Sequence, residues 1–450
     1  MSDESASQVL DRNIDLIKRY LQSAKDEGQP TALLMGAGAS ISAGIPLADG
    51  FVKIINDNYD FKLVGATSEQ RKSYQYCMWC LPLSNRKAVI KAELAKARLN
   101  WGHIALAQLI KEGYFSRILT FNFDQLLEQS LSLLGQLAPV YDFGTAPSEE
   151  TEYIAEPAII HLHGQGYGIK LIHDQEETDK HIEKLRPVFQ NTIQTRDFLV
   201  IGYSGDSDPY LQLLNEFFKG DHELLWLNYG DSPGAELDVL RERQQTRIFN
   251  CCDFDQIMIG LAKKLGVWPP EFVNNPLSHI NVEISQIADY PLQDDGSDEF
   301  VILGFLKKRL EVEIPAWDEK TKAQRTISEV FHRPNDDGMI YRLTNLLRNQ
   351  EKILTDDMKD MAAWAFILHG HHLSDQAFSK KGPAADRMFE KSYQRYQAAL
   401  DIKPDHHSAL YNWGTTLSDQ AITKQGDAAD DLFRQAYDMF RTALKVKPDK

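Results

Sequence analysis

Polar side chains follow apolar segments at several points of this 450-residue chain, and their types suit proton transfer and sugar binding. Asn122 and Asp124 come after segment 116–121, and His163 stands beside Gly164 at the end of segment 158–162. An asparagine amide offers donors and an acceptor, so it can orient a hydroxyl or a water. Histidine exchanges protons near neutral pH. We predict these three residues as catalytic candidates. The alternatives are that Asp124 only caps a helix and that His163 is structural.

A glycine-rich turn lies between Thr31 and Pro46, in the sequence TALLMGAGASISAGIP. Gly36 and Gly38 lack the Cβ atoms that would keep backbone away from a ligand. A helix that begins near Ser40 would direct its N–H groups and positive dipole end at phosphates. Position 41 is isoleucine, so the common G-x-G-x-x-G fingerprint is incomplete. The pattern predicts a pyrophosphate cradle, and a tight turn without a ligand is the alternative.

Two further segments end in groups that suit phosphate and ribose. Segment 198–202 ends at Gly202 and leads into Tyr203 and Ser204, which supply hydroxyls and amides. Segment 224–228 ends at Asn228, which is either a ribose partner or a simple turn residue.

The elements that must position these residues alternate between strand and helix up to about residue 270, which predicts a Rossmann-like, doubly wound α/β fold with a parallel sheet. Ligands bind such sheets beyond the carboxyl ends of the strands, where the candidates lie. The expected strands are 31–35, 116–121, 158–162, 198–202, 224–228 and 247–251. The expected helices include 101–111, 123–134, 208–218 and 254–265, after a leading amphipathic helix.

The rest of the chain is predicted to be an all-α helical-repeat domain. We expect a catalytic domain at 1–270, a linker at 271–300 and a helical domain at 301–450. Residues 373–405 align with residues 417–449 at an offset of 44, and the unit resembles tetratricopeptide repeats. Such arrays present a surface to partners, so we predict a protein partner or self-association there. Because the last unit reaches Lys450 without a capping helix, we expect either a truncated chain or packing on another chain. A plain helical bundle with a chance duplication is the alternative.

Composition limits the possible partners. A net charge of −16 opposes binding to nucleic acids and anionic membranes, and we expect neither partner. The start of the chain lacks the pattern of a signal peptide, and four cysteines fit a reducing cytoplasm. Cys77 and Cys80 form one C-x-x-C pair, which is half of a structural zinc site. We therefore predict a cytoplasmic protein without zinc.

Taken together, the motifs resemble the sirtuin family over about residues 30–268. They are GAGAS-xx-AGIP, T-x-N-x-D, L-H-G and G-x-S-G, followed by NCCDFDQIMIGLAKKLGVW. The resemblance implies an NAD-binding fold that breaks the nicotinamide–ribose bond. It implies that Asn122 and Asp124 hold the nicotinamide ribose and a water, and that His163 is the general base. The residues that it implies for the dinucleotide are Gly36, Ala37, Gly38, Ser40, Gly202, Ser204 and Asn228.

Two departures from the family pattern bear on the reaction. Protein-deacylating sirtuins carry paired C-x-x-C motifs between the histidine and the G-x-S strand, whereas residues 164–201 contain no cysteine. Here Leu47-Ala48-Asp49 also replaces the family's Asp-Phe-Arg. The pattern looks closest to bacterial antiphage sirtuin-like proteins, such as those of Thoeris systems, which hydrolyse NAD.

The sequence therefore predicts an NAD glycohydrolase, with NAD as the substrate. We expect an abortive-infection effector that is regulated through its helical repeats. An NAD-dependent deacylase or ADP-ribosyltransferase, and a non-catalytic NAD or ADP-ribose sensor that scaffolds an assembly, are the alternatives.

Overall fold

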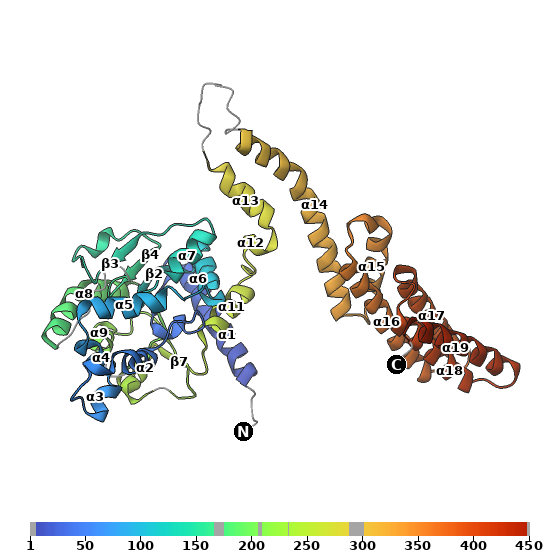
Figure 1. The fold of residues 1–450 in the computed structure, drawn as a ribbon, viewed down its shortest axis with the longest axis horizontal. Helices are drawn as coiled ribbons and strands as arrows, with labels where there is room; N and C mark the ends of the chain where they lie inside the picture. The colour runs from blue at the N-terminus through green and yellow to red at the C-terminus, as the bar shows by residue number, and fades with distance from the viewer. Residues whose placement is uncertain (1–5, 166–174, 206–208, 233, 288–300, 448–450) are drawn as a thin grey trace. The chain divides into compact units, whose positions relative to one another are not determined.

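A seven-stranded parallel sheet forms the centre of the first part of the chain, in the computed structural model shown in Figure 1. The structure describes residues 6–165, 175–205, 209–232, 234–287 and 301–447. The strand order is β3-β4-β2-β1-β5-β6-β7, and every neighbouring pair is parallel. The strands are β1 (Thr31–Met35), β2 (Phe115–Thr120), β3 (Val140–Asp142), β4 (Ala158–His161), β5 (Phe198–Ile201), β6 (Leu224–Leu227) and β7 (Thr246–Phe249).

Helices cover both faces of this sheet, which confirms the predicted doubly wound α/β class. The longer ones are α1 (Ala6–Asp26), α6 (Trp101–Lys111), α7 (Leu126–Leu133), α8 (Gln175–Thr195), α9 (Pro209–Phe217) and α11 (Phe254–Lys264). Short helices α10 (Asp238–Arg241) and α12 (Glu271–Asn274) lie in the connections, as do the 3-10 turns 151–153 and 235–237. No described helix is both long and apolar enough to span a bilayer.

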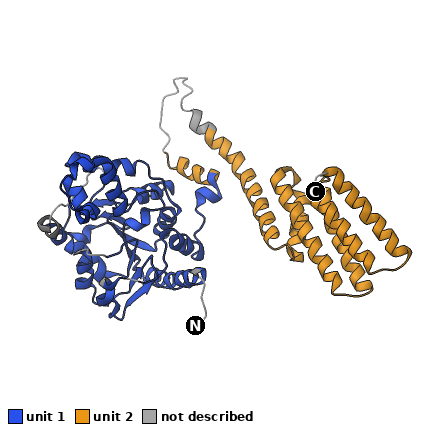
Figure 2. Ribbon diagram, turned by 60° about the horizontal axis from the view of Figure 1, so that its bottom comes forward, with its two compact units in different colours: residues 1–276 blue, residues 277–450 orange. Residues whose placement is uncertain are grey.

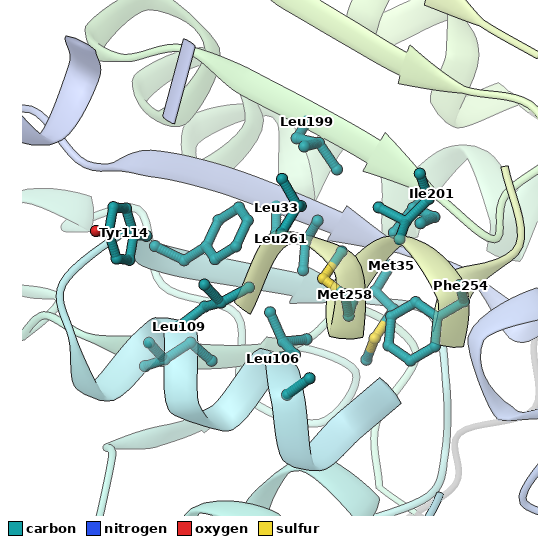
Figure 3. Close-up of a cluster of buried hydrophobic side chains, with 14 of the residues drawn as sticks. Leu33, Met35, Leu106, Leu109, Tyr114, Leu199, Ile201, Phe254, Met258 and Leu261 are labelled. Atoms are coloured by element: carbon teal, nitrogen blue, oxygen red, sulfur yellow. The ribbon is translucent and has the colours of Figure 1, made fainter. Parts of the chain in front are cut away.

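Alternating side chains of β1 enter two separate cores, because successive residues of a strand point to opposite faces. Leu33 and Met35 pack with α6 and α11 on one face, as Figure 3 shows. Ala32 and Leu34 pack on the other face with side chains of α8 and α9. All five residues of β1 are buried, which explains why the strand is a continuous apolar run.

The predicted helix near Ser40 is wrong. A 3-10 turn, η1 (Ala37–Ser40), follows β1, and the next helix is α2 (Ala48–Tyr59). The reason lies in the residues between them. Gly44 adopts a φ of +92°, which ends the turn, and Pro46 has no N–H with which to continue a helix.

A small helical insert separates η1 from α6. It contains α2, the turn 60–62, α3 (Ser68–Lys72), α4 (Tyr74–Cys80) and α5 (Leu83–Leu94). Its own apolar core includes Phe51, Ile55 and Cys77. The Cys77 thiol lies 3.3 Å from the Arg71 carbonyl oxygen, and burial raises its pKa. Cys77 is therefore a packed thiol of this insert.

The second compact unit spans residues 277–450, coloured apart from residues 1–276 in Figure 2. In the predicted linker, α12 and α13 (Pro276–Ser285) are helical, and residues 288–300 lie outside the described residues. The domain boundaries stay a prediction. Further on come α14 (Val301–His332), α15 (Asp337–Asn349), the turn 351–353, α16 (Asp356–Phe378), α17 (Pro383–Ile402), α18 (His407–Ile422) and α19 (Asp427–Val446).

The 44-residue sequence repeat corresponds to two helical hairpins, α16–α17 and α18–α19. Gly382 and Gly426, which are 44 residues apart, have φ values of +59° and +61°. Gly370 and Gly414 stand at equivalent positions, and a Cβ on either would lie within 3 Å of an aromatic ring, that of Tyr396 or Phe440. The duplicated sequence thus forms a duplicated structure.

Candidate functional site

The sheet register aligns the ends of the four central strands. Met35 pairs with Thr120 and Ile201, and Thr120 pairs with His161, so these residues form one row across β5, β1, β2 and β4. The residues that follow this row emerge at the same edge. They include Gly36, Asn122, His163 and Gly202. The chain passes from β1 to β2 in one direction along the sheet and from β5 to β6 in the other. Open α/β sheets bind ligands at the point where the strand order reverses in this way.

The glycines of the first turn pack against protein backbone. A Cβ on Gly36 would lie 2.4 Å from the Gly202 carbonyl oxygen, and one on Gly38 would lie 2.9 Å from Gly202 Cα. The Gly36 and Gly38 amides donate to the carbonyls of Ile201 and Gly202, at 3.0 and 2.9 Å. These glycines let the ends of β1 and β5 meet. That these glycines also allow the backbone to approach a pyrophosphate stays a prediction.

We expect Gly36→Ala to lower the free energy of unfolding by about 1–3 kcal/mol, because its methyl group would push apart two strand ends. Urea denaturation measures this effect. Gly230→Ala is the control, since a Cβ there meets nothing nearer than 3.7 Å. Equal stabilities of the two variants would contradict the packing role.

Ser40 links two of the predicted catalytic residues. Its hydroxyl donates to Asp124 Oδ2 at 2.8 Å and accepts from Asn122 Nδ2 at 2.9 Å. Because the hydroxyl has a single proton and gives it to Asp124, the amide nitrogen of Asn122 must be the atom that faces Ser40. Asn122 Oδ1 is then left buried without a hydrogen-bond partner among the described residues.

Asp124 is held from two sides. Its Oδ1 accepts the backbone N–H of Leu126 at 3.2 Å, which orients the first turn of α7. Burial raises the pKa of this carboxyl, and the hydrogen bond from Ser40 opposes that shift. Asp124 therefore positions Ser40 as well as the start of the helix that we had predicted to begin at residue 123.

His161 forms a buried clamp that the sequence did not reveal. Its Nδ1 lies 2.9 Å from the Asn122 carbonyl oxygen, and its Nε2 lies 2.7 Å from Glu128 Oε1. Both partners are acceptors, so the imidazole bonds both fully only when it is protonated. Burial lowers its pKa, but the hydrogen bond and charge of Glu128 outweigh burial and raise it. The clamp fixes the backbone of Asn122.

We expect Glu128→Gln to reduce stability by about 1–3 kcal/mol at about pH 5.5 and by less at about pH 8.5. A pKa raised in the fold adds stability that is fully present below the unfolded value of 6.5 and is lost as the pH rises through the folded value. Denaturation at both pH values measures the difference. A pH-independent loss would contradict a charged clamp.

Aromatic rings and a second imidazole surround His163. Its ring centroid is 5.0 Å from that of Phe121, 5.1 Å from that of Tyr210 and 6.0 Å from that of His181. Burial, with a smaller effect of His181, lowers the pKa of His163 to about 3. The imidazole is therefore neutral at pH 7. Its Nε2 is buried and has no hydrogen-bond partner among the described residues.

The other predicted residues are less closely grouped. Ala37 is exposed in η1, and Ser204 is exposed between Gly202 and Gly205. Asn228 lies two strands from β1, where its amide donates to the Gly230 carbonyl at 2.9 Å. This contact is typical of a turn residue, which is one of the two roles that the sequence predicts for Asn228. Its binding of ribose stays a prediction.

No metal-binding cluster of three or more histidine, cysteine or acidic side chains occurs in the part of the chain that the structure describes. The residues after β4 supply a neutral imidazole, and those after β2 supply an amide oxygen, while a separate hydrogen-bonded group joins the amide nitrogen to a hydroxyl and a carboxylate. Such groups can orient a hydroxyl or a water and take a proton from it.

Part of this site lies in a segment that matches the model of a known family. Residues 116–248 match the SIR2-like domain. No curated protein matches the chain. The match includes the ends of β2, β4, β5 and β6 and begins after η1.

Solved structures of sirtuins are similar over about half of the chain. A complex of a Sir2 homologue with NAD is 15% identical, with a TM-score of 0.34, and the match covers 56% of this chain and 93% of that one. Sir2 bound to an acetylated peptide is 14% identical, with a TM-score of 0.34 and coverages of 56% and 99%. The segment 116–248, which matches the SIR2-like domain, lies on the parallel α/β sheet.

Proposed function

We propose that this protein is an NAD glycohydrolase that converts NAD and water into nicotinamide, ADP-ribose and a proton. One observation carries the proposal. Asn122 Oδ1 and His163 Nε2 are buried at the ends of the neighbouring strands β2 and β4, and neither has a partner among the described residues. Buried polar atoms without partners are costly, and a polar ligand bound at this pair would offset that cost.

The reaction suits these groups. The bond between nicotinamide and ribose breaks with its electrons going to the pyridine nitrogen, so nicotinamide leaves as a neutral molecule. The ribose acquires oxocarbenium character, and a water then bonds to its C1′ and loses a proton. In this proposal Asn122 Oδ1 orients the water or a ribose hydroxyl, and neutral His163 takes up the proton. Asp124 acts through Ser40, which holds the Asn122 amide.

Incubation of the purified full chain with NAD tests this proposal, with nicotinamide and ADP-ribose quantified by chromatography. We expect release of both products in equal amounts. An acetyl-lysine peptide is added in a parallel reaction. Nicotinamide release that depends on the peptide and equals its deacetylation would indicate the deacylase alternative. Tight NAD binding without turnover would indicate a sensor.

The wider role that we propose is an antiphage effector whose activity is controlled through the helical unit. The sequence resemblance to sirtuin-like defence proteins supports it. In phage-infected cells that carry the chain, we expect cellular NAD to fall, and we expect Asn122→Ala to prevent the fall. An equal fall with this variant would contradict the proposed effector role.

A further inference from the structure

Helix α19 carries an aromatic and aliphatic stripe that faces solvent. Phe433, Tyr437 and Leu444 are 45%, 64% and 51% exposed. They follow one another at spacings of four and seven residues, so they lie on the same side of the helix. Buried residues of α19 are Ala436 and Ala443, on its inner side. A stripe of this kind on a helix of repeats marks a packing surface.

The preceding repeat shows which kinds of side chain cover the equivalent surface of α17. Positions 44 residues earlier lie on α17, where α18 packs. Phe389, the counterpart of Phe433, is fully buried and contacts Phe378 of α16, with ring centroids 5.8 Å apart. Tyr393, the counterpart of Tyr437, stacks on Trp413 of α18 at 6.2 Å and donates a hydrogen bond to Gln420.

A charge contact accompanies the stacked rings. The carboxylate of Asp386, the counterpart of Asp430, lies 2.6 Å from Lys424 Nζ. Because α17 and α18 are joined by the short turn 403–406, they run in opposite directions. The α17 face is thus covered by the antiparallel helix α18, which presents a ring to the tyrosine, and by the turn after α18, where Lys424 presents an ammonium to the carboxylate.

We propose that the exposed stripe of α19 binds α19 of a second copy of this chain, antiparallel across a two-fold axis at Tyr437. In this arrangement the two Tyr437 rings meet. Position 430 lies opposite position 444, since each is seven residues from the axis, and Lys445 is adjacent. The pair therefore supplies a ring and an ammonium, as α18 and the turn after it do for α17.

The charges along α19 favour this antiparallel pairing. Its first turns carry Asp427, Asp430 and Asp431, its last turn carries Lys445, and Lys447 follows its end. Two copies in opposite directions place each acidic end against a basic end, whereas a parallel pair would place like charges together. The surface is self-complementary, as a two-fold interface requires.

Sedimentation of the full chain over a range of concentrations tests the proposal, independently of any NAD cleavage. We expect a dimer, and we expect Tyr437→Glu to raise its dissociation constant by about tenfold or more. Asp430→Lys and Lys445→Asp should each weaken the dimer, and the double variant should restore it, because both contacts then have opposite charges again.

Tyr341→Glu is the matched control. Tyr341 is 69% exposed on α15 in the same unit, and its replacement should leave the dimer unchanged. Thermal melts confirm that each variant folds. If the chain stays monomeric up to about 100 µM, the stripe binds something other than a second copy, and the proposal is overturned. A dimer that is indifferent to Tyr437→Glu, or a double variant without rescue, would overturn it as well.

Discussion

Replacing Asn122 by alanine is expected to lower kcat for NAD cleavage by about 100- to 1,000-fold. The substitution removes the buried Oδ1 that we propose to orient the water or ribose, and it removes the donor to Ser40. KM for NAD should change less than kcat, because the lost contact concerns the reacting ribose and not the rest of the dinucleotide. Steady-state kinetics of nicotinamide release measures both constants.

Asn58→Ala is the control for this experiment. Among the described residues, the Asn58 amide donates only to the Ile54 carbonyl of its own helix, at 2.9 Å on an exposed surface, and its loss should leave kcat unchanged. Asn122→Ala must also retain the wild-type circular dichroism spectrum. A folded Asn122→Ala protein with full kcat would remove Asn122 from the mechanism.

The order of strands and helices was largely predictable, because buried strands and helices differ in hydrophobic period and length. The segment 31–35 is apolar throughout, since both of its faces are buried, and its predicted bounds are those of β1. Strand β3 was missed. It has three residues at the edge of the sheet, and its residues are partly exposed, so no apolar run marks it.

The candidate site was predictable only at the level of residue types. Asn122 and His163 could be predicted as candidates because each follows an apolar segment that becomes a central strand. The clamp of His161 with Glu128 was not predicted, because it joins a strand to a helix across a separation of 33 positions in the chain. The packing of Gly36 against backbone was not predicted, for a related reason. Its close neighbour is Gly202, which follows another strand, and no local pattern shows that contact.

His163→Gln is expected to lower kcat by about 100- to 10,000-fold, because the proposed base is lost. In acid, by contrast, this substitution should reduce the loss of folding stability. In the unfolded chain His163 takes up a proton near pH 6.5, whereas in the fold burial lowers its pKa to about 3. The wild type therefore loses stability as the pH falls from 6.5 towards 3, and His163→Gln should lose less over that range. Denaturation curves across this pH range measure the difference.

His103→Gln separates the catalytic role from the effect of burial. Burial also lowers the pKa of His103 to about 3, but its Nδ1 contacts Asn100 at 2.5 Å and it follows no strand of the sheet. This variant should likewise lose less stability in acid than the wild type, while it retains kcat. If both variants lost kcat equally, the loss would reflect disturbed packing. If His163→Gln alone lost kcat, the imidazole at the end of β4 would be the group that takes the proton.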